Sequence, residues 1–460
     1  MLKRMRSFLV LVMLFIAVTM SAQVTTATMS GKVTAQDEPI IGATVVAVHE
    51  PSGTRYGTVT NVSGQFNLQG MRTGGPYKVE ISYVGYQTAI YKGINLLLGE
   101  NYVLNVSLKE SSELLDEVVV TASKESNMKS DRAGAIMNAN RDMINSTPTI
   151  SRSISDIMRL SPQGADVGNG FAVGGGNYRQ SFVTVDGAAF NNTFGLGGNL
   201  PANGSPISLD ALEQVTVAVT PFDVRQSGFT GGAINAVTRS GDNQFRGTAY
   251  MYFNNENLKG SKVDDYELLR SKAQYYTYGA SFGGPIIKDK LFFFVNGEYE
   301  DNVTAGSSYL PRTALGQSYS SGNVHRPLQS DMDAISNFLI NKYDFNPGKY
   351  NGYSTDTPAY RIMARVDWNA NQDNKVSFRF TRTHTKDSNF PTSSTNPLYS
   401  SDLYPGGKSN EVIDGKPVGD IAKGQGRTSK YALSFSNSNY YQVRDFTSVA
   451  GEWNSRMAQG

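Results

Sequence analysis

The chain has 460 residues, a length that predicts about three domains. Its formal net charge is only +2, from 42 basic and 40 acidic residues, so no basic excess points to a nucleic acid partner. It has 46 glycines, 25 tyrosines and 22 phenylalanines but no cysteine. This composition favours short strands and turns, and it excludes a disulfide framework and a thiolate metal site.

The N-terminus has the outline of a secretory signal. Lys3, Arg4 and Arg6 form a basic start, and residues 8–18 form an uninterrupted apolar run. That run is shorter than the roughly 20 residues that a transmembrane helix needs. We therefore expect a signal peptide over residues 1–22, cleaved after Ala22.

Residues 23–110 are predicted to form an all-β module. Strands are expected at 30–33, 43–48 and 77–83, with a turn at Gly64, and this spacing is typical of a sandwich of about seven strands. The segments 31–33, 39–45, 63–66 and 84–86 resemble the carboxypeptidase regulatory-like domain. The resemblance implies a transthyretin-like β-sandwich without peptidase activity, of the kind that precedes some outer-membrane transporters.

Residues 111–130 are a polar linker with one β-forming segment, made of Glu117, Val118, Val119, Val120, Thr121 and Ala122. Such a segment can be an exposed strand that pairs with a partner's edge, the last strand of the sandwich, or the first strand of the next domain. The residues themselves leave these alternatives open. The run 115–122 resembles the TonB box of outer-membrane transporters. The resemblance implies that TonB, driven by the ExbB/ExbD motor, adds a strand here and pulls.

Residues 131–241 are predicted to form a compact α/β unit. A short capped helix is expected within 151–160, with Ile154, Ile157 and Met158 on one face, and strands at 181–187 and 213–219. Seven residues carry a resemblance to the plug domain of TonB-dependent receptors: Asp186, Gly187, Glu213, Gly231, Gly232, Asn235 and Arg239. Residues 221–230 resemble the Oar-like subgroup more than siderophore receptors. Candidate substrate contacts on the plug are Tyr178, Arg179, Phe190, Asn191, Asn192 and Phe194.

Residues 242–460 alternate between apolar and polar positions in strands of about ten residues, the length that crosses an outer membrane. Between 360 and 368 the apolar residues share one face, and Arg361, Arg365 and Asp367 share the other. Strands are predicted near 245–253, 274–283, 290–300, 359–369, 374–384, 428–436 and 441–453. Short links at 284–289 and 370–373 would be periplasmic turns, and 301–358 and 385–427 would be extracellular loops, the first with a helix at 331–343.

Seven strands cannot close a barrel, because an open edge in lipid leaves backbone groups unpaired. The resemblance implies about 22 strands, so we expect the chain to be an N-terminal portion of a longer protein. The predicted fold class is mainly β: a signal peptide, a β-sandwich, an α/β plug and a partial antiparallel transmembrane β-barrel.

No enzymatic site is predicted. His49, His325 and His384 lie far apart in the sequence, so we expect no metal, no cofactor and no catalytic residue. The predicted function is TonB-dependent import of a large or scarce substrate across the Gram-negative outer membrane. The alternative is a surface binding or adhesion protein without transport. Besides TonB, the expected partners are outer-membrane lipid and a surface lipoprotein.

Overall fold

The computed structural model describes most of the chain after the predicted signal peptide. The described residues are 24–110, 118–121, 136–149, 152–167, 170–192, 200, 206–219, 230–258, 260, 262–264, 266–267, 272–319, 323–391, 412–413, 416–417 and 432–455. The predicted signal peptide, Glu117, Ala122 and Phe194 lie outside these ranges.

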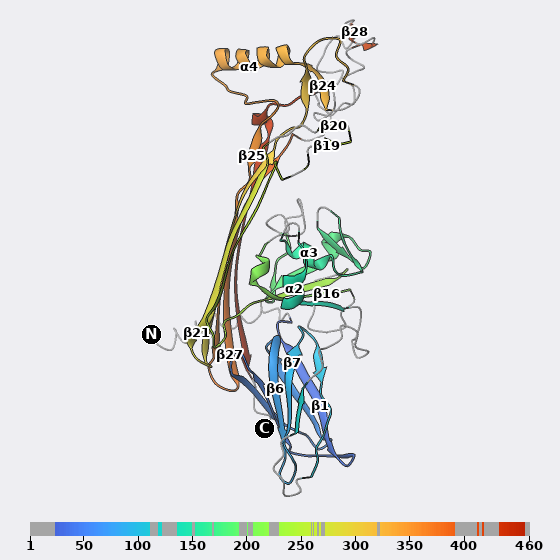
Figure 1. The fold of residues 1–460 in the computed structure, drawn as a ribbon, viewed down its shortest axis with the longest axis vertical. Helices are drawn as coiled ribbons and strands as arrows, with labels where there is room; N and C mark the ends of the chain where they lie inside the picture. The colour runs from blue at the N-terminus through green and yellow to red at the C-terminus, as the bar shows by residue number, and fades with distance from the viewer. Residues whose placement is uncertain are drawn as a thin grey trace, which may run out of the picture.

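Residues 24–110 form the predicted sandwich, at one end of the molecule (Figure 1). One sheet contains β1 (Ala27–Ala35), β2 (Glu38–Pro39), β5 (Gln65–Met71), β8 (Asn101–Val103) and β9 (Val106–Ser107). The other contains β3 (Thr44–His49), β4 (Thr54–Val59), β6 (Gly74–Ser82) and β7 (Ala89–Leu96). Alternate residues of both sheets, among them Val33, Val45 and Val79, fill one apolar core. Gly64 makes the predicted turn with φ +72°, and a Cβ there would lie 2.6 Å from the Val33 carbonyl oxygen.

The β-forming segment of the linker lies on the sandwich. Val118–Thr121 forms β10, which pairs in parallel with β7 from Val118 opposite Ala89 to Thr121 opposite Lys92. Of the three alternatives that the residues left open, the structure therefore shows the edge strand of the sandwich sheet. The pairing is a property of the backbone, and it covers an edge that β7 would otherwise expose.

The next part, described between residues 136 and 241, is an α/β unit that we call the central unit. Its sheet has the order β11 (Ile136–Asn140), β16 (Leu212–Ala218), β17 (Ala233–Thr238), β14 (Phe182–Val185) and β15 (Ala188–Ala189). Helices α2 (Arg141–Ser146) and α3 (Ile154–Met158) and the hairpin of β12 (Gly164–Asp166) and β13 (Phe171–Val173) complete it. Helix α3 is the predicted short helix: Ser153 caps it in a capping box with Asp156, and its apolar face is fully buried.

A curved antiparallel sheet, which we call the strand wall, runs along the side of the central unit (Figure 1). Its long strands, in order, are β18 (Arg246–Asn255), β21 (Gln274–Ile287), β22 (Leu291–Ala305), β26 (Ala359–Asn369), β27 (Asn374–Asn389) and β30 (Tyr440–Ser455), and the short β25 (Ser354–Asp356) pairs with β22. Neighbouring long strands are all antiparallel, as predicted for the partial barrel.

The strand predicted at 428–436 is wrong where the structure describes it. Residues 432–435 have no regular structure, and Ser436–Ser438 forms a short 3-10 helix, η5. The backbone N–H groups of Ser436 and Asn437 donate to the carbonyls of Lys349 and Pro347 in another loop. These residues therefore bond to a loop and not to a neighbouring strand, and β30 pairs directly with β27.

This correction makes the loop pattern more regular. The connections 288–290 and 370–373 are short, whereas 256–273, 306–358 and 390–439 are long, so short and long connections alternate strictly. The short turns lie at the sandwich end, and α4 (Gln329–Tyr343), β24 (Val324–Leu328) and their loops lie at the far end (Figure 1). Helix α4 confirms the helix predicted at 331–343.

The two faces of the strand wall are the reverse of those in a water-soluble sheet. On β26, Ile362 and Trp368 point outward and are 48% and 50% exposed, whereas Arg361 and Arg365 face the central unit and are 4% and 7% exposed. Apolar residues outside and polar residues inside are the pattern of an outer-membrane barrel. Each helix of the described ranges is too short or too polar to span a membrane.

Candidate functional site

Asp186 lies where the central unit meets the strand wall. β14 ends at Val185, and Asp186 and Gly187 continue in a tight turn with φ values of 49° and 78°. The turn directs the Asp186 carboxylate over the end of β17. There it accepts hydrogen bonds from the Thr238 backbone N–H at 2.9 Å and from the Thr238 hydroxyl at 2.6 Å. The side chain is thereby held in one orientation toward the wall.

Two arginines of the strand wall meet this carboxylate. Arg365 of β26 and Arg379 of β27 are direct cross-strand neighbours, and both are buried on the inner face. Like charges at such positions repel each other unless an acid lies between them. The Asp186 carboxylate is that acid, 3.4 Å from Arg365 Nη1 and 3.6 Å from Arg379 Nε. The central unit therefore supplies the carboxylate that separates these two neighbouring cations of the wall.

Each arginine has a second carboxylate on its outer side. The Arg365 guanidinium donates through Nε and Nη2 to Asp367, both at 2.9 Å, in a forked geometry. Arg379 donates through Nη2 to Glu452 of β30 at 2.5 Å. Both outer acids lie toward the sandwich end of the wall.

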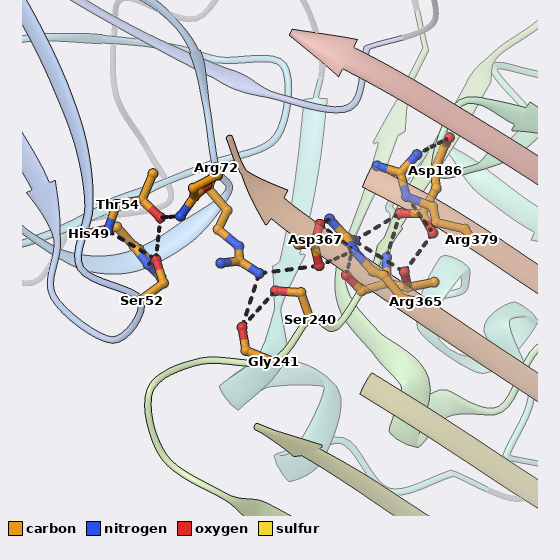
Figure 2. A network of polar contacts seen from close by, with 12 residues as sticks. His49, Ser52, Thr54, Arg72, Asp186, Ser240, Gly241, Arg365, Asp367 and Arg379 are labelled. Carbon is orange, nitrogen blue, oxygen red and sulfur yellow. Dashed lines mark hydrogen bonds and ion pairs between the residues drawn. The ribbon is translucent and has the colours of Figure 1, made fainter. Parts of the chain in front are cut away.

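The sandwich contacts both outer acids. Arg72 Nη2 lies 3.6 Å from Asp367 Oδ2 and donates to the Gly241 carbonyl at 3.3 Å, and the Thr25 hydroxyl donates to Glu452 at 2.7 Å. Three guanidinium groups and three carboxylates thus alternate in one series, which we call the ionic chain: Glu452, Arg379, Asp186, Arg365, Asp367 and Arg72. Figure 2 shows the part from Arg379 to Arg72.

The buried groups around Arg72 are neutral. The Arg72 backbone N–H donates to the Tyr56 hydroxyl, and its carbonyl accepts from the Tyr77 hydroxyl at 2.7 Å. Burial raises the pKa of Tyr56 and of Tyr77, so both phenols stay protonated. Burial, together with the charge of Arg72, lowers the pKa of His49 to about 3. Arg72 is therefore the cation that this part of the sandwich presents to the wall.

His49 begins a second, uncharged link between the same parts. Its Nδ1 lies 2.7 Å from Ser52 Oγ, which lies 2.7 Å from Thr54 Oγ1, and that oxygen accepts from Asn369 Nδ2 of the wall at 2.9 Å. A polar cavity of about 360 Å³ lies at this junction, lined by residues of all three parts, including the ionic chain except Asp186. The described residues hold no group of three or more His, Cys, Asp or Glu that could bind a metal ion.

A smaller ionic group fixes the central unit to the wall beside the ionic chain. Asp210 pairs with Arg239 at 3.7 Å and with Arg141 at 3.6 Å, and it accepts from the Thr248 hydroxyl of β18 at 2.7 Å. Burial acts to raise the pKa of Asp210, but hydrogen bonds from Ser281 and Thr248 and the neighbouring arginines outweigh it and lower the pKa. The carboxylate is therefore ionised at neutral pH.

The plug-motif residues have separate roles. Asp186 and Arg239 face the wall, Glu213 lies beside Gly74 of the sandwich, and Asn235 accepts from the Thr184 hydroxyl within the sheet. Gly231 and Gly232 serve packing: a Cβ at Gly232 would lie 2.5 Å from Val173 Cγ1. The sequence prediction did not include the partners of Asp186. Inward-facing arginines at 365 and 379 were the available signal, because a charge in a lumen needs a partner.

The predicted substrate contacts fall into two groups. Tyr178 and Arg179 lie in the exposed 3-10 helix η1 (Tyr178–Gln180), where Arg179 Nε donates to the Tyr178 hydroxyl. Phe190 is 1% exposed, and its ring centroid lies 4.6 Å from that of Phe446. The Asn191 side-chain amide accepts from the Val183 backbone N–H and donates to the Ser181 carbonyl. A substrate cannot reach Phe190 or the Asn191 amide in this arrangement, because core packing and backbone hydrogen bonds occupy them. Asn192 is half-buried beside them.

Two family models match the chain. Residues 28–109 match the carboxypeptidase regulatory-like domain, and residues 237–415 match an outer membrane beta barrel domain. The first match coincides with the sandwich. The second covers most of the strand wall.

Two curated proteins are similar to the chain. The TonB-dependent transporter Oar of Myxococcus xanthus is 27% identical over 259 residues, which are 54% of this chain and 22% of Oar. The TonB-dependent receptor SusC of Bacteroides thetaiotaomicron is 24% identical over 454 residues, 90% of this chain and 43% of SusC. The chain therefore spans less than half the length of either relative.

Among solved structures, the siderophore receptor PirA from Acinetobacter baumannii is similar with a TM-score of 0.38 and 17% identity, covering 62% of this chain and 35% of PirA. The outer membrane transporter YddB from Escherichia coli has a TM-score of 0.40 and 12% identity, covering 56% of this chain and 34% of YddB.

Proposed function

We propose that this chain, which belongs to the TonB-dependent outer-membrane receptors, carries the plug and part of the barrel of an energy-coupled importer. In this proposal the strand wall lies in the outer membrane, the sandwich lies in the periplasm and the long loops lie outside the cell. The central unit is the plug. Its displacement opens the path for a large or scarce substrate.

The polar contact between the central unit and the wall carries the proposal. Besides the ionic chain, Glu298 of β22 accepts from the Ser208 hydroxyl of the central unit at 2.9 Å, and the Thr383 hydroxyl of β27 donates to the Pro206 carbonyl at 2.8 Å. Buried ion pairs fix a position but add little net stability, because their desolvation offsets their attraction. Water can also replace each of these partners. Such contacts suit a unit that is seated in one place and is released during transport.

TonB is the proposed source of the force. The β10 backbone is extended at the edge of the sandwich sheet, the form in which one strand adds to another. We propose that TonB, with its ExbB/ExbD motor, binds residues 117–122 and pulls. Tyr178 and Arg179 remain the proposed substrate contacts. The proposed binding surface for a surface lipoprotein is the loop end with α4, where Phe338 is 52% exposed.

The plug assignment is tested by conductance of the full-length protein in planar lipid bilayers. Deleting residues 136–241 is expected to produce a large, steady ion conductance, while the parent protein conducts little. Deleting residues 24–110 serves as the matched comparison, because it removes a part of similar size but leaves the central unit in the lumen, so it is expected to conduct only intermittently. Equal conductance of the parent and the 136–241 deletion would refute the plug.

The coupling segment is tested by cross-linking in cells. A cysteine at Val119 is expected to cross-link to a cysteine scan of the periplasmic domain of TonB. A cysteine at Val84, which is 92% exposed on the same sandwich, is the control and is expected to stay unlinked. Equal cross-linking at both positions would contradict a specific TonB segment, and no cross-linking at either position would favour a surface protein without transport.

A further inference from the structure

The sandwich binds both of the other parts at the same end of the molecule. Toward the wall, Thr54 accepts from Asn369. Toward the central unit, the Leu98 backbone N–H donates to Gln214 Oε1 at 2.9 Å, and Glu100 accepts from Asn138 Nδ2 at 2.6 Å. The sandwich therefore covers the boundary between the wall and the central unit at this end of the molecule.

This docking surface is mainly polar, with one small apolar cluster of Val24, Leu98 and Val237. Arg72 and Asp367 retain 18% and 14% side-chain exposure, and Lys375 of the wall lies over the Tyr56 ring at 4.0 Å. Interfaces of this kind within one chain permit the domains to separate, because little apolar surface holds them together.

We infer that the sandwich is a docked cap whose seating is coupled to the seating of the central unit through the ionic chain. Arg72 and Thr25 hold the two ends of the chain, and Asp186 of the central unit lies in its middle. The inference deepens the proposed function in one respect, since it takes the central unit to be the part that moves.

The coupling follows from two physical effects. First, each outer acid is shared: Asp367 lies between Arg72 and Arg365, and Glu452 between Thr25 and Arg379. When the sandwich undocks, the ionic chain loses Arg72 and keeps three carboxylates but only two guanidinium groups. Second, undocking opens the cavity of about 360 Å³ to solvent. The higher local dielectric then weakens the ion pairs that hold Asp186.

The consequence is an order of events. The outermost contacts, at Arg72 and Thr25, separate before the inner ones at Asp186. While the sandwich is docked, the central unit stays in place and the path stays closed. Force applied at β10, which is paired with β7 of the sandwich, reaches the docking surface before it reaches the central unit.

A single cysteine reports the separation of central unit and wall. The 460 residues contain no cysteine, and Thr383 is 0% exposed because it contacts the central unit through the Pro206 carbonyl. In a cysteine-free background of the full-length protein in detergent, maleimide labels Thr383→Cys only when the central unit has moved. Arg72→Met is expected to raise the labelling rate about tenfold, in the range of couplings within one ionic network.

Two variants complete this arm. Arg55→Met, an exposed arginine of β4 in the same sandwich, is the matched control and is expected to label at the parent rate. Arg72→Lys keeps the positive charge but loses the planar guanidinium group, so its labelling rate is expected to lie between those of the parent and Arg72→Met. Labelling of Arg72→Met within twofold of the parent would overturn the inference.

A second arm keeps the test valid if Arg72→Met disturbs the sandwich itself. The Asn243 backbone N–H donates to the Pro51 carbonyl at 2.9 Å, and Asn243 also bonds to Asp289 in a short turn of the wall. Cysteines at positions 51 and 243 can therefore lock the sandwich onto the segment that leads into β18. Hydrogen exchange of the β16 and β17 amides is expected to slow when the disulfide forms and to recover on reduction. Unchanged exchange would overturn the coupling. Neither experiment uses TonB or substrate. If the central unit is not the plug, the bilayer conductance shows it, whereas labelling and hydrogen exchange test only the coupling between sandwich and central unit.

Discussion

Asp186→Asn is the substitution that the ionic chain makes most informative. It keeps the size of the side chain and an oxygen that can accept from the Thr238 N–H, but it removes the charge between Arg365 and Arg379. The chain then has three guanidinium groups and two carboxylates. The two arginines, which are cross-strand neighbours, are left facing each other without an acid between them.

Removing one partner of a buried ion pair costs about 3–5 kcal/mol, because the remaining charge stays buried without compensation. Arg365 keeps Asp367 and Arg379 keeps Glu452, so we expect the lower end, about 3 kcal/mol. At 1.36 kcal/mol for each factor of ten, the central unit should separate from the wall about a hundred times more often.

The assay is the maleimide labelling rate of Thr383→Cys in the full-length protein. Asp387→Asn is the control, because Asp387 pairs with Arg444 of the same wall but both side chains are about a quarter exposed, 27% and 23%. An exposed pair contributes about 0–1 kcal/mol, so its loss should change the rate less than about fivefold. A change of less than fivefold for Asp186→Asn as well would refute the reasoning.

Three further predictions concern the parts separately. His49 is neutral when folded, with its pKa lowered to about 3, so its contribution to sandwich stability is complete above the unfolded pKa of about 6.5 and falls as pH falls toward 3. At pH 5 the loss of stability is about 2 kcal/mol. It is measured as faster hydrogen exchange of the β3 and β6 amides after correction for the intrinsic exchange rate, and it should vanish in His49→Gln. Gly232→Ala places a Cβ 2.5 Å from Val173 and should destabilise the central unit by about 1–3 kcal/mol in urea unfolding, whereas Gly231→Ala, with its nearest atom at 3.2 Å, should cost less. Ser153→Ala removes the N-cap of α3 and should lower the free energy of unfolding by about 1 kcal/mol in the same measurement. An equal loss on substitution of the exposed Leu160 by alanine would contradict a stabilising role of the cap.

Local patterns were sufficient to predict most elements. The period-two alternation at 360–368 set which side chains of β26 face the central unit, since successive residues of a strand point to opposite faces. Ser153 with three apolar residues at helical spacing predicted α3. The same reasoning failed at 432–436, because a short alternating run looks the same whether its backbone bonds to a neighbouring strand or to a loop. Only the second was true there.

The site was less accessible to sequence reasoning. The plug motif included Asp186, but not its partners, which lie 179 and 193 residues away at Arg365 and Arg379. Nothing in the local pattern of Phe190 distinguishes a core ring from an exposed one; its contact with Phe446 decides that.

By itself, the sequence determined the order of the parts, the faces of the strands and the presence of charged residues on the inner face of the wall. Those properties follow from periodicity, which acts over a few residues. The tertiary structure alone decided that six charges from three parts form one alternating series and that β10 lies on the sandwich. Pairing of this kind depends on which surfaces meet in space, and charges so far apart in the chain acquire partners only when the whole arrangement brings them together.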